Sequence, residues 1–226
     1  MERPTLAFVP GFMQRGDAWV PVSERLKERY PSVVLDRARE RPPAGAVPVG
    51  YSMGGRLVLH AALAEPERWP ALVLVGVSAG VDDPESRRRS DAELADWIEA
   101  HPIEEVVERW ERSPVFASQS PELRAAQRPG RLSHEPAALA RELRECGQGA
   151  LPPVWDRLGE VEVPVLLVAG ELDEPYVQAG RRMAALMPRA EQRTVPDCGH
   201  APQLEAPAAV AALIDSFCAG LRFNAA

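Results

Sequence analysis

The stretch Val47-Pro48-Val49-Gly50-Tyr51-Ser52-Met53-Gly54-Gly55 decides the fold of this chain. A short apolar strand over 47–50 runs into the pattern glycine-x-serine-x-glycine, and a helical pattern over 54–63 follows it. A serine between two glycines at such a junction sits on a tight, strained turn at the end of a sheet. An ordinary glycine-rich turn gives the same letters, but the strand before it and the helix after it favour a nucleophilic Ser52.

Apolar runs and helical patterns alternate on both sides of this turn. Helical patterns are expected at 19–28, 54–63, 177–187 and 208–218, and strands are expected at 6–9, 32–36, 47–50, 71–75, 163–170 and about 191–195. Such alternation is typical of a mostly parallel central sheet with helices on its faces. The sequence therefore predicts an α/β fold.

The alternation stops between residues 82 and 149, where no strand is expected. Helical patterns at 86–100, 103–112 and 136–145 occupy this stretch, with Pro and Gly between them. The simplest prediction is an α/β core, made of residues 1–81 and 150–226, that is interrupted by a helical cap, or lid, over residues 82–149.

The composition argues against nucleic-acid binding, a membrane segment and a zinc site. The net charge of −7 does not favour nucleic-acid binding, and no apolar run is long enough to span a bilayer. The first residues lack the features of a signal peptide. Three scattered cysteines without CxxC spacing indicate reduced thiols and argue against a zinc site. We expect a cytoplasmic protein with no membrane segment and no metal site.

A serine hydroxyl becomes a nucleophile or base when an imidazole takes its proton and a carboxylate orients that imidazole. In folds with this serine turn, the order along the chain is serine, acid, histidine, with the last two after strands. His200 follows the last expected strand, whereas His60 lies in the helix after Ser52. His101 and His134 lie in the helical stretch, so His200 is the candidate base.

The acid is expected after the preceding strand, where Gly170-Glu171-Leu172-Asp173 offers two carboxylates. Asp173 is favoured over Glu171, although an aspartate in a loop often caps a helix instead. The predicted catalytic triad is Ser52, Asp173 and His200. A Cys198–His200 pair is the weaker alternative, because side chains two positions apart rarely face each other.

Two backbone N–H groups are needed to stabilise the negative charge that develops on a substrate oxygen. The N–H of Met53, at the start of the helix after Ser52, is one candidate. The N–H of Phe12, in the loop after the first strand, is the other. Together they form the expected oxyanion hole.

With these motifs in place, the sequence resembles the α/β-hydrolase superfamily over nearly its whole length. More narrowly, it resembles the SHCHC synthases of menaquinone biosynthesis, which are MenH-type lyases. The narrower resemblance rests on the serine turn with its following Arg56 and on segments in the helical stretch. These segments are Arg87-Arg88-Arg89-Ser90-Asp91 with Leu94-Ala95, Trp110 with Pro114-Val115-Phe116, Arg131-Leu132-Ser133-His134, and Gly147-Gln148-Gly149. Trp155-Asp156, which follows the helical stretch, also matches.

The resemblance implies an enzyme that eliminates pyruvate from a small, anionic substrate with several carboxylates. The activated serine would remove a proton beside a carbonyl, and arginines would hold the carboxylates. The arginines that match are Arg56, Arg131 and one of Arg87 or Arg88. For Arg131 and for Arg87 or Arg88, a position on a solvated helix face is an equally good explanation. Tyr51 and Trp110 are expected to line the pocket, although core packing explains Trp110 as well. No metal or organic cofactor is implied.

Four features depart from the lyase pattern. Pro10 stands where His is usual, Glu111 follows Trp110 in place of Tyr, and Ala201-Pro202 follows His200. The stretch from 36 to 47 is too short for the helix that usually precedes the serine strand. The alternative function is therefore a serine hydrolase, a carboxylesterase or thioesterase of small acyl substrates. A non-catalytic binding protein on this fold is a third hypothesis, which an intact triad disfavours.

Overall fold

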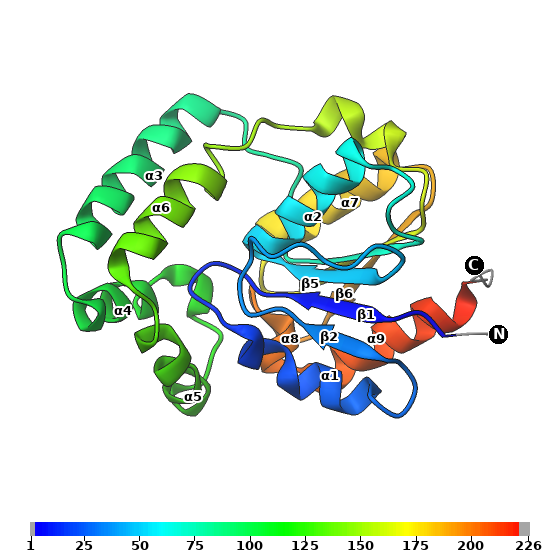
Figure 1. Cartoon of the computed structure of the whole chain (residues 1–226), viewed down its shortest axis with the longest axis horizontal. Coiled ribbons are helices and arrows are strands. Elements are labelled where there is room, and N and C mark those ends of the chain that lie inside the picture. The colour runs from blue at the N-terminus through cyan, green and yellow to red at the C-terminus, as the bar shows by residue number, and fades with distance from the viewer. Residues whose placement is uncertain (1–2, 222–226) are drawn as a thin grey trace.

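The computed structural model describes residues 3–221, and a six-stranded sheet forms its centre (Figure 1). The strand order is β2-β1-β3-β4-β5-β6, and every pair of neighbouring strands is parallel. The strands are β1 (Leu6–Val9), β2 (Ser32–Val34), β3 (Val47–Tyr51), β4 (Leu72–Val75), β5 (Val165–Gly170) and β6 (Ala190–Val195). This sheet confirms the predicted α/β fold.

The inner strands are buried along their whole length. Every residue of β1, β3, β4 and β5 is buried, whereas those of β2 at the edge are exposed. A parallel strand with helices on both faces has no solvent-facing side, so it reads as a continuous apolar run such as Leu72–Val75. This explains why the inner strands were predictable from the sequence.

Helices cover both faces of the sheet (Figure 1). One face carries α1 (Val20–Leu26), α8 (Pro202–Glu205) and α9 (Pro207–Gly220), and the other carries α2 (Ser52–Ala64) and α7 (Glu174–Leu186). Alternate strand residues serve the two sides, because successive side chains of a strand point to opposite faces. Leu6 and Phe8 pack in the core cluster that contains Trp19, and Val9 packs in the cluster that contains Leu59.

Four helices come between β4 and β5 and lie together beside the sheet (Figure 1). These inserted helices are α3 (Pro84–Glu99), α4 (Ile103–Glu111), α5 (Pro121–Leu132) and α6 (Pro136–Cys146). Their apolar faces form a third cluster, in which Ile98 and Leu139 are grouped with Phe12 and Met53 of the sheet region. The inserted helices therefore pack on the end of the sheet that carries the serine turn.

The sequence did not predict α5. Ser120 begins it, since its hydroxyl accepts a hydrogen bond from the N–H of Leu123 at 3.2 Å. Pro129 and Gly130 lie inside the helix, and such residues normally mark a helix end. Pro129 is near the last turn, where the lost backbone hydrogen bond disturbs few residues.

Shorter elements complete the fold. Three 3-10 helices are η1 (Gly16–Trp19), η2 (Pro114–Phe116) and η3 (Trp155–Glu160). As the sequence predicted, the stretch from 35 to 46 contains turns and no helix. None of the helices within residues 3–221 combines the length and the apolar character needed to cross a bilayer. The two ends of the predicted core, residues 1–2 and 222–226, lie outside the described residues.

Candidate active site

The serine turn, which comprises residues 50–55, links β3 directly to α2. Ser52 has a φ of 49°, in the left-handed region that non-glycine residues rarely adopt. A Cβ on Gly50 would lie 2.5 Å from the Cα of Gly55, and a Cβ on Gly54 would lie 2.2 Å from the carbonyl oxygen of Pro10. The glycines therefore allow the tight packing that holds Ser52 in this strained conformation.

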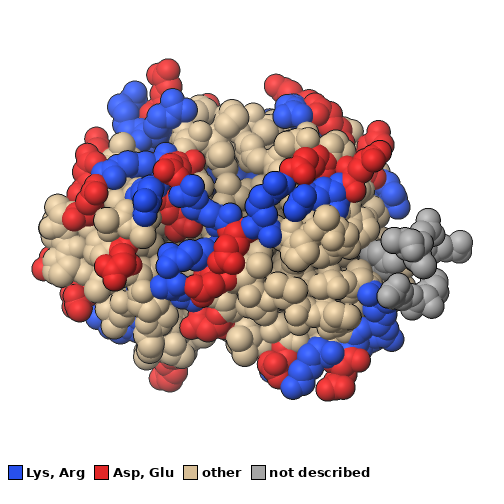
Figure 2. Space-filling view, viewed as in Figure 1, with Lys and Arg blue, Asp and Glu red and all other residues tan. Residues whose placement is uncertain are grey.

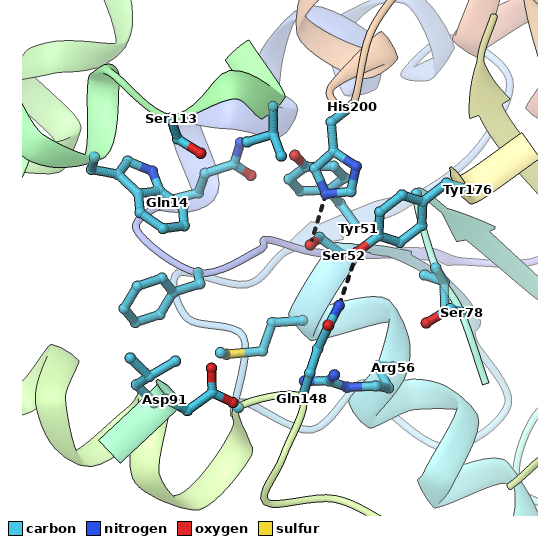
Figure 3. Close-up of a pocket in the computed structure, with 18 of the residues that line it drawn as sticks. Gln14, Tyr51, Ser52, Arg56, Ser78, Asp91, Ser113, Gln148, Tyr176 and His200 are labelled. Carbon is cyan, nitrogen blue, oxygen red and sulfur yellow. Dashed lines mark hydrogen bonds between the residues drawn. The ribbon is translucent and has the colours of Figure 1, made fainter. Parts of the chain in front are cut away.

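Ser52, His200 and Asp173 meet at the carboxyl ends of three strands. Oγ of Ser52 lies 3.2 Å from Nε2 of His200 (Figure 3). Nδ1 of His200 lies 2.7 Å from Oδ2 of Asp173. A carboxylate only accepts hydrogen bonds, so Nδ1 carries the proton and Nε2 is free to accept one from Ser52. The geometry can therefore transfer the serine proton to the imidazole.

Two glutamate side chains accept hydrogen bonds from the backbone of the loop that carries His200. The carboxylate of Glu205 accepts hydrogen bonds from the N–H of Gly199 at 2.9 Å and of Ala201 at 3.2 Å. Glu171, the other candidate acid, is exposed and accepts from the N–H of Asp197 at 3.2 Å. Glu171 thus braces the histidine loop, while Asp173 is the carboxylate that contacts His200.

The other histidines and the nearby cysteine lie outside this arrangement. Burial lowers the pKa of His60 and of His134 to about 4, so both are neutral at neutral pH. The ring of His101 stacks on Trp97, and its Nδ1 contacts the Trp97 carbonyl oxygen at 2.6 Å. Burial raises the pKa of the Cys198 thiol to about 11, so this thiol is a poor nucleophile.

The two predicted oxyanion donors flank Ser52. Phe12 follows β1 and Met53 is the second residue of α2, and both line the cavity in front of the serine. The N–H of Met53 has no acceptor within its helix, because the first N–H groups of a helix lack a preceding turn. Gly11 brings the Phe12 loop close, since a Cβ there would lie 2.7 Å from the ring of Tyr51. This arrangement suits an oxyanion hole.

A cavity of about 250 Å³ opens above Ser52, between the sheet and the inserted helices (Figure 3). Its walls combine charged and polar side chains with aromatic and aliphatic ones. The polar lining residues are Gln14, Tyr51, Ser52, Arg56, Ser78, Arg87, Asp91, Ser113, Arg131, Gln148, Tyr176 and His200. The larger apolar ones are Phe12, Met53, Val77, Leu94, Trp110, Val115, Phe116 and Leu143.

Arg56 is the buried cation of this cavity. It is 5% exposed, and Nη2 donates to the carbonyl oxygen of Cys146 at 2.7 Å. Its Nε is buried without a partner, and no carboxylate within residues 3–221 forms an ion pair with it. Burial lowers the pKa of Arg56 to about 10, so the group stays charged at neutral pH. The helix begins at Ser52, which places Arg56 in the second turn of α2.

The predicted arginines of the inserted helices differ in their surroundings. Arg131 is buried, donates to Oε1 of Glu111 at 3.1 Å and lies over the ring of Phe116. Arg87 lines the cavity, and its Nε donates to Oδ1 of Asp91 at 2.7 Å. Both arginines therefore already have a protein carboxylate as partner.

Arg88 takes a different direction from Arg87. Its Nε donates to the carbonyl oxygen of Gly149 at 3.0 Å, and it is not among the residues that line the cavity. Neighbouring residues of a helix point about 100° apart, and of these two only Arg87 lines the cavity. The alternative between Arg87 and Arg88 is therefore decided in favour of Arg87 as the cavity residue.

Tyr51 and Trp110, the two predicted aromatic residues, both line the cavity. Tyr51 is fully enclosed, and burial raises the pKa of its phenol above the ordinary value. Trp110 packs edge-on against Phe12 and also contacts Phe116, with ring centres 5.3 and 5.6 Å apart. Trp110 thus serves both the cavity wall and the packing of the inserted helices.

Six polar residues of the cavity were not predicted as site residues: Gln14, Ser78, Asp91, Ser113, Gln148 and Tyr176. Gln14 accepts from the N–H of Gly11 at 3.3 Å, and Asp91 accepts from the N–H of Gly149 at 2.9 Å. Gln148 donates to the hydroxyl of Tyr176 at 2.9 Å. One signal was available, because Tyr176 follows the predicted acid Asp173 by three positions in the first turn of α7.

The described residues contain no metal-binding cluster, and the face drawn in Figure 2 carries no charged patch of one sign. Among residues 3–221, no group of three or more His, Cys, Asp or Glu side chains is placed to hold a metal ion. On the face in Figure 2, arginines and acidic side chains are interspersed over the surface. That mixed surface is unlike the basic stripe of nucleic-acid binding proteins.

This chain is similar to known proteins in sequence and in fold. The model of a family described as the alpha/beta hydrolase family matches residues 16–213. A Bacillus subtilis (strain 168) protein, provisionally named 2-succinyl-6-hydroxy-2,4-cyclohexadiene-1-carboxylate (SHCHC) synthase, is 36% identical over 175 residues. That match covers 75% of this chain and 64% of the relative, so the chain spans less than two thirds of the relative's length.

Two further matches cover nearly the whole chain. The SHCHC synthase of Serratia proteamaculans (strain 568) is 26% identical over 244 residues, which covers 96% of this chain and 93% of the relative. The structure of MenH from S. aureus superposes with a TM-score of 0.88 at 28% identity. It covers 96% of this chain and 94% of that structure.

Proposed function

The chain belongs to the alpha/beta hydrolase family, and from that premise we propose that it is a lyase of the SHCHC synthase type. Ser52, His200 and Asp173 act as its catalytic triad, and the N–H groups of Phe12 and Met53 form its oxyanion hole. The relatives named for this activity support the proposal.

One observation carries the choice of an anionic substrate. Arg56 is a buried guanidinium that pairs with none of the carboxylates among the described residues, and it lines the same cavity as Ser52. A buried charge without a partner is costly, and a substrate carboxylate that binds there relieves that cost. Arg87 and Arg131 add charge at the side of the inserted helices, where they are already oriented by Asp91 and Glu111.

The proposed reaction is an elimination. His200 takes the proton of Ser52, and the serine oxygen then removes a proton from the carbon beside a substrate carbonyl. The resulting negative charge on the carbonyl oxygen is stabilised by the two N–H groups. The electron pair of the broken C–H bond then forms a carbon–carbon double bond while the C–O bond to the pyruvate unit breaks. The departing enolate takes a proton and becomes pyruvate.

The inserted helices have a separate part in this proposal. We propose that residues 82–149 act as a cap over the site, and that residues 1–81 and 150–226 form the core that carries the triad. Such a cap excludes water from an anionic intermediate. Residues 87 and 131 lie in the cap segment, so substrate binding and cap position are coupled.

The location of the protein is also a proposal. Cys146, Cys198 and Cys218 are all free and buried. Free thiols in a small protein suit a reducing compartment, so we propose that the enzyme works in the cytoplasm.

A hydrolase of small esters or thioesters is the second candidate, favoured by a different observation. Phe12, Met53 and Phe116 line the cavity beside Ser52 and could surround an acyl group. In that reaction Ser52 attacks the carbonyl carbon, the C–O or C–S bond of the substrate breaks, and the alcohol or thiol leaves with the proton that His200 took from Ser52. Water then hydrolyses the covalent acyl-enzyme and releases the acid.

A direct assay separates the two functions. The protein is mixed with the pathway precursor of SHCHC that still contains the pyruvate unit, and pyruvate release is followed with lactate dehydrogenase and NADH. We expect rapid release. Absence of pyruvate together with fast hydrolysis of 4-nitrophenyl butyrate would establish the hydrolase and contradict the lyase.

A further inference from the structure

The side-chain amide of Gln148 joins a cap arginine to a tyrosine of the core. Its Oε1 accepts a hydrogen bond from Nη1 of Arg87 at 2.6 Å. Its Nε2 donates to the hydroxyl of Tyr176 at 2.9 Å (Figure 3). The two ends of an amide are assigned from their partners. A guanidinium has only donors, so the amide oxygen must face Arg87 and the NH₂ group must face Tyr176.

This orientation determines the role of the Tyr176 hydroxyl. Because it receives a hydrogen bond from Gln148, its oxygen is the acceptor, and its own proton points elsewhere. Within residues 3–221, no protein acceptor takes that proton. A hydroxyl whose oxygen accepts a hydrogen bond is also a better donor, since a chain of hydrogen bonds polarises its members. The Tyr176 hydroxyl is therefore a stronger hydrogen-bond donor, and no described residue accepts its proton.

Tyr176 lies beside His200 on the wall of the cavity. The residue lies in the first turn of α7, and its ring centre is 4.4 Å from that of His200. Tyr176 lines the same cavity as Ser52 and Arg56. Burial raises the pKa of its phenol, so the hydroxyl keeps its proton at neutral pH and acts as a donor.

The loop that carries Gln148 is built to hold it in place. A Cβ on Gly147 would lie 2.6 Å from Oδ2 of Asp91, and a Cβ on Gly149 would lie 2.2 Å from the N of Arg88. The glycines on either side of Gln148 therefore pack directly against α3. The same Asp91 carboxylate accepts from the N–H of Gly149 and from Arg87, so the amide and its arginine share one support.

We propose that Tyr176 is a substrate-contacting residue whose hydroxyl, oriented by Gln148, donates a hydrogen bond to the substrate carboxylate that Arg56 also binds. Gln148 is its positioning residue. The identity of the substrate rests on the proposed function, whereas the donor role needs only an anionic ligand in this cavity. Two donors from α2 and α7 fix the carboxylate in orientation, which one guanidinium alone does less well.

Removal of the hydroxyl tests this role. We compare kcat/KM for mono-(4-nitrophenyl) glutarate, which has a free carboxylate, with kcat/KM for neutral 4-nitrophenyl butyrate. The ratio of the two values cancels any general effect on the triad. Tyr176→Phe should lower this ratio about tenfold, mainly through KM of the glutarate ester, as expected for one lost hydrogen bond to a charged group.

A matched control and a second variant sharpen the result. Tyr30→Phe removes a phenol that bonds Asp215 at 2.9 Å and does not line the cavity, so it should leave the ratio unchanged. Gln148→Leu should lower the ratio about threefold in the natural background and should have no further effect in the Tyr176→Phe background. The proposal would be overturned if the ratio of kcat/KM values for Tyr176→Phe were within twofold of that for the natural protein. It would also be overturned if Gln148→Leu lowered this ratio equally in the natural and the Tyr176→Phe backgrounds.

The ester pair also separates this inference from the proposed function. If the natural protein releases no pyruvate from the SHCHC precursor, the lyase assignment fails, but the ratio of ester activities still decides the role of Tyr176. If pyruvate is released and Tyr176→Phe keeps the natural KM for the precursor, the lyase assignment stands and the role of Tyr176 is refuted.

Discussion

Oγ of Ser52 and Nε2 of His200 lie 3.2 Å apart, although 148 positions separate them in the chain. They meet because β3 and β6 are parallel members of one sheet, so the loops after both strands open on the same edge. Asp173 reaches that edge from β5. The proposed chemistry therefore depends on the order of the strands and on the turns at their ends.

Asp173 should matter for turnover far more than for folding. Replacement by Asn keeps the size of the side chain but offers Nδ1 of His200 a group that no longer fixes the imidazole tautomer. We expect Asp173→Asn to lower kcat for 4-nitrophenyl butyrate about 10⁴-fold, with a melting temperature close to that of the natural protein. A loss below tenfold would mean that another carboxylate orients His200.

Arg56 should discriminate between charged and neutral substrates. Arg56→Met retains the apolar stem and removes the buried guanidinium, so it should lower the ratio of activity on mono-(4-nitrophenyl) glutarate to that on 4-nitrophenyl butyrate at least tenfold. Arg157→Met is the matched control, because Arg157 pairs with Glu160 at the surface and does not line the cavity. Equal losses on both esters would show that Arg56 serves the fold and not the substrate.

The serine turn should tolerate no side chain at Gly54. Gly54→Ala would place a Cβ 2.2 Å from the Pro10 carbonyl oxygen, so backbone must shift. We expect a loss of about 2 kcal/mol or more and a melting temperature lowered by about 5 °C, measured by calorimetry. Gly159→Ala is the control, since its nearest neighbour would lie 4.0 Å away. Equal melting temperatures for the two variants would refute the packing argument.

Stability should depend on pH through His134. This imidazole is 4% exposed, and within residues 3–221 neither of its nitrogens has a hydrogen-bond partner. Its pKa is about 4 in the folded protein, against about 6.5 for a free imidazole. The unfolded chain therefore binds more protons between these values, and stability should be complete above pH 6.5 and fall as the pH decreases toward 4. The cause is burial, with Arg15 and Arg37 adding repulsion and Asp36 opposing it.

His134→Leu should remove part of this dependence, of the order of 1–3 kcal/mol over the window. The measurement is the free energy of unfolding in urea at pH 7.0 and pH 4.5 for both proteins. The natural protein should lose more stability between the two pH values than the variant does. The same loss in both proteins would show that His134 does not contribute.

The sequence allowed the sheet and the triad to be predicted because both have local signals. Inner strands such as Leu72–Val75 are continuous apolar runs, and the glycines around Ser52 are required by contacts within a few ångströms. His200 and Asp173 could be chosen because the fold orders the triad along the chain.

Other features depend on contacts between distant segments, and a local sequence pattern does not predict such contacts. Gln148 and Tyr176 belong to different elements, and only the packing of the inserted helices against the core brings them together. α5 was missed because Pro129-Gly130 is typical of a helix end. The direction of Arg88 is set by the carbonyl of Gly149, a partner 61 positions away.

The most direct test of the central claim is the initial rate of pyruvate release from the SHCHC precursor by the natural protein and by Ser52→Ala, measured side by side. We expect rapid release by the natural protein and a loss of at least about 10³-fold in the variant, with the fold of the variant unchanged by circular dichroism. Release at the natural rate by Ser52→Ala, or no release by either protein, would contradict the central claim.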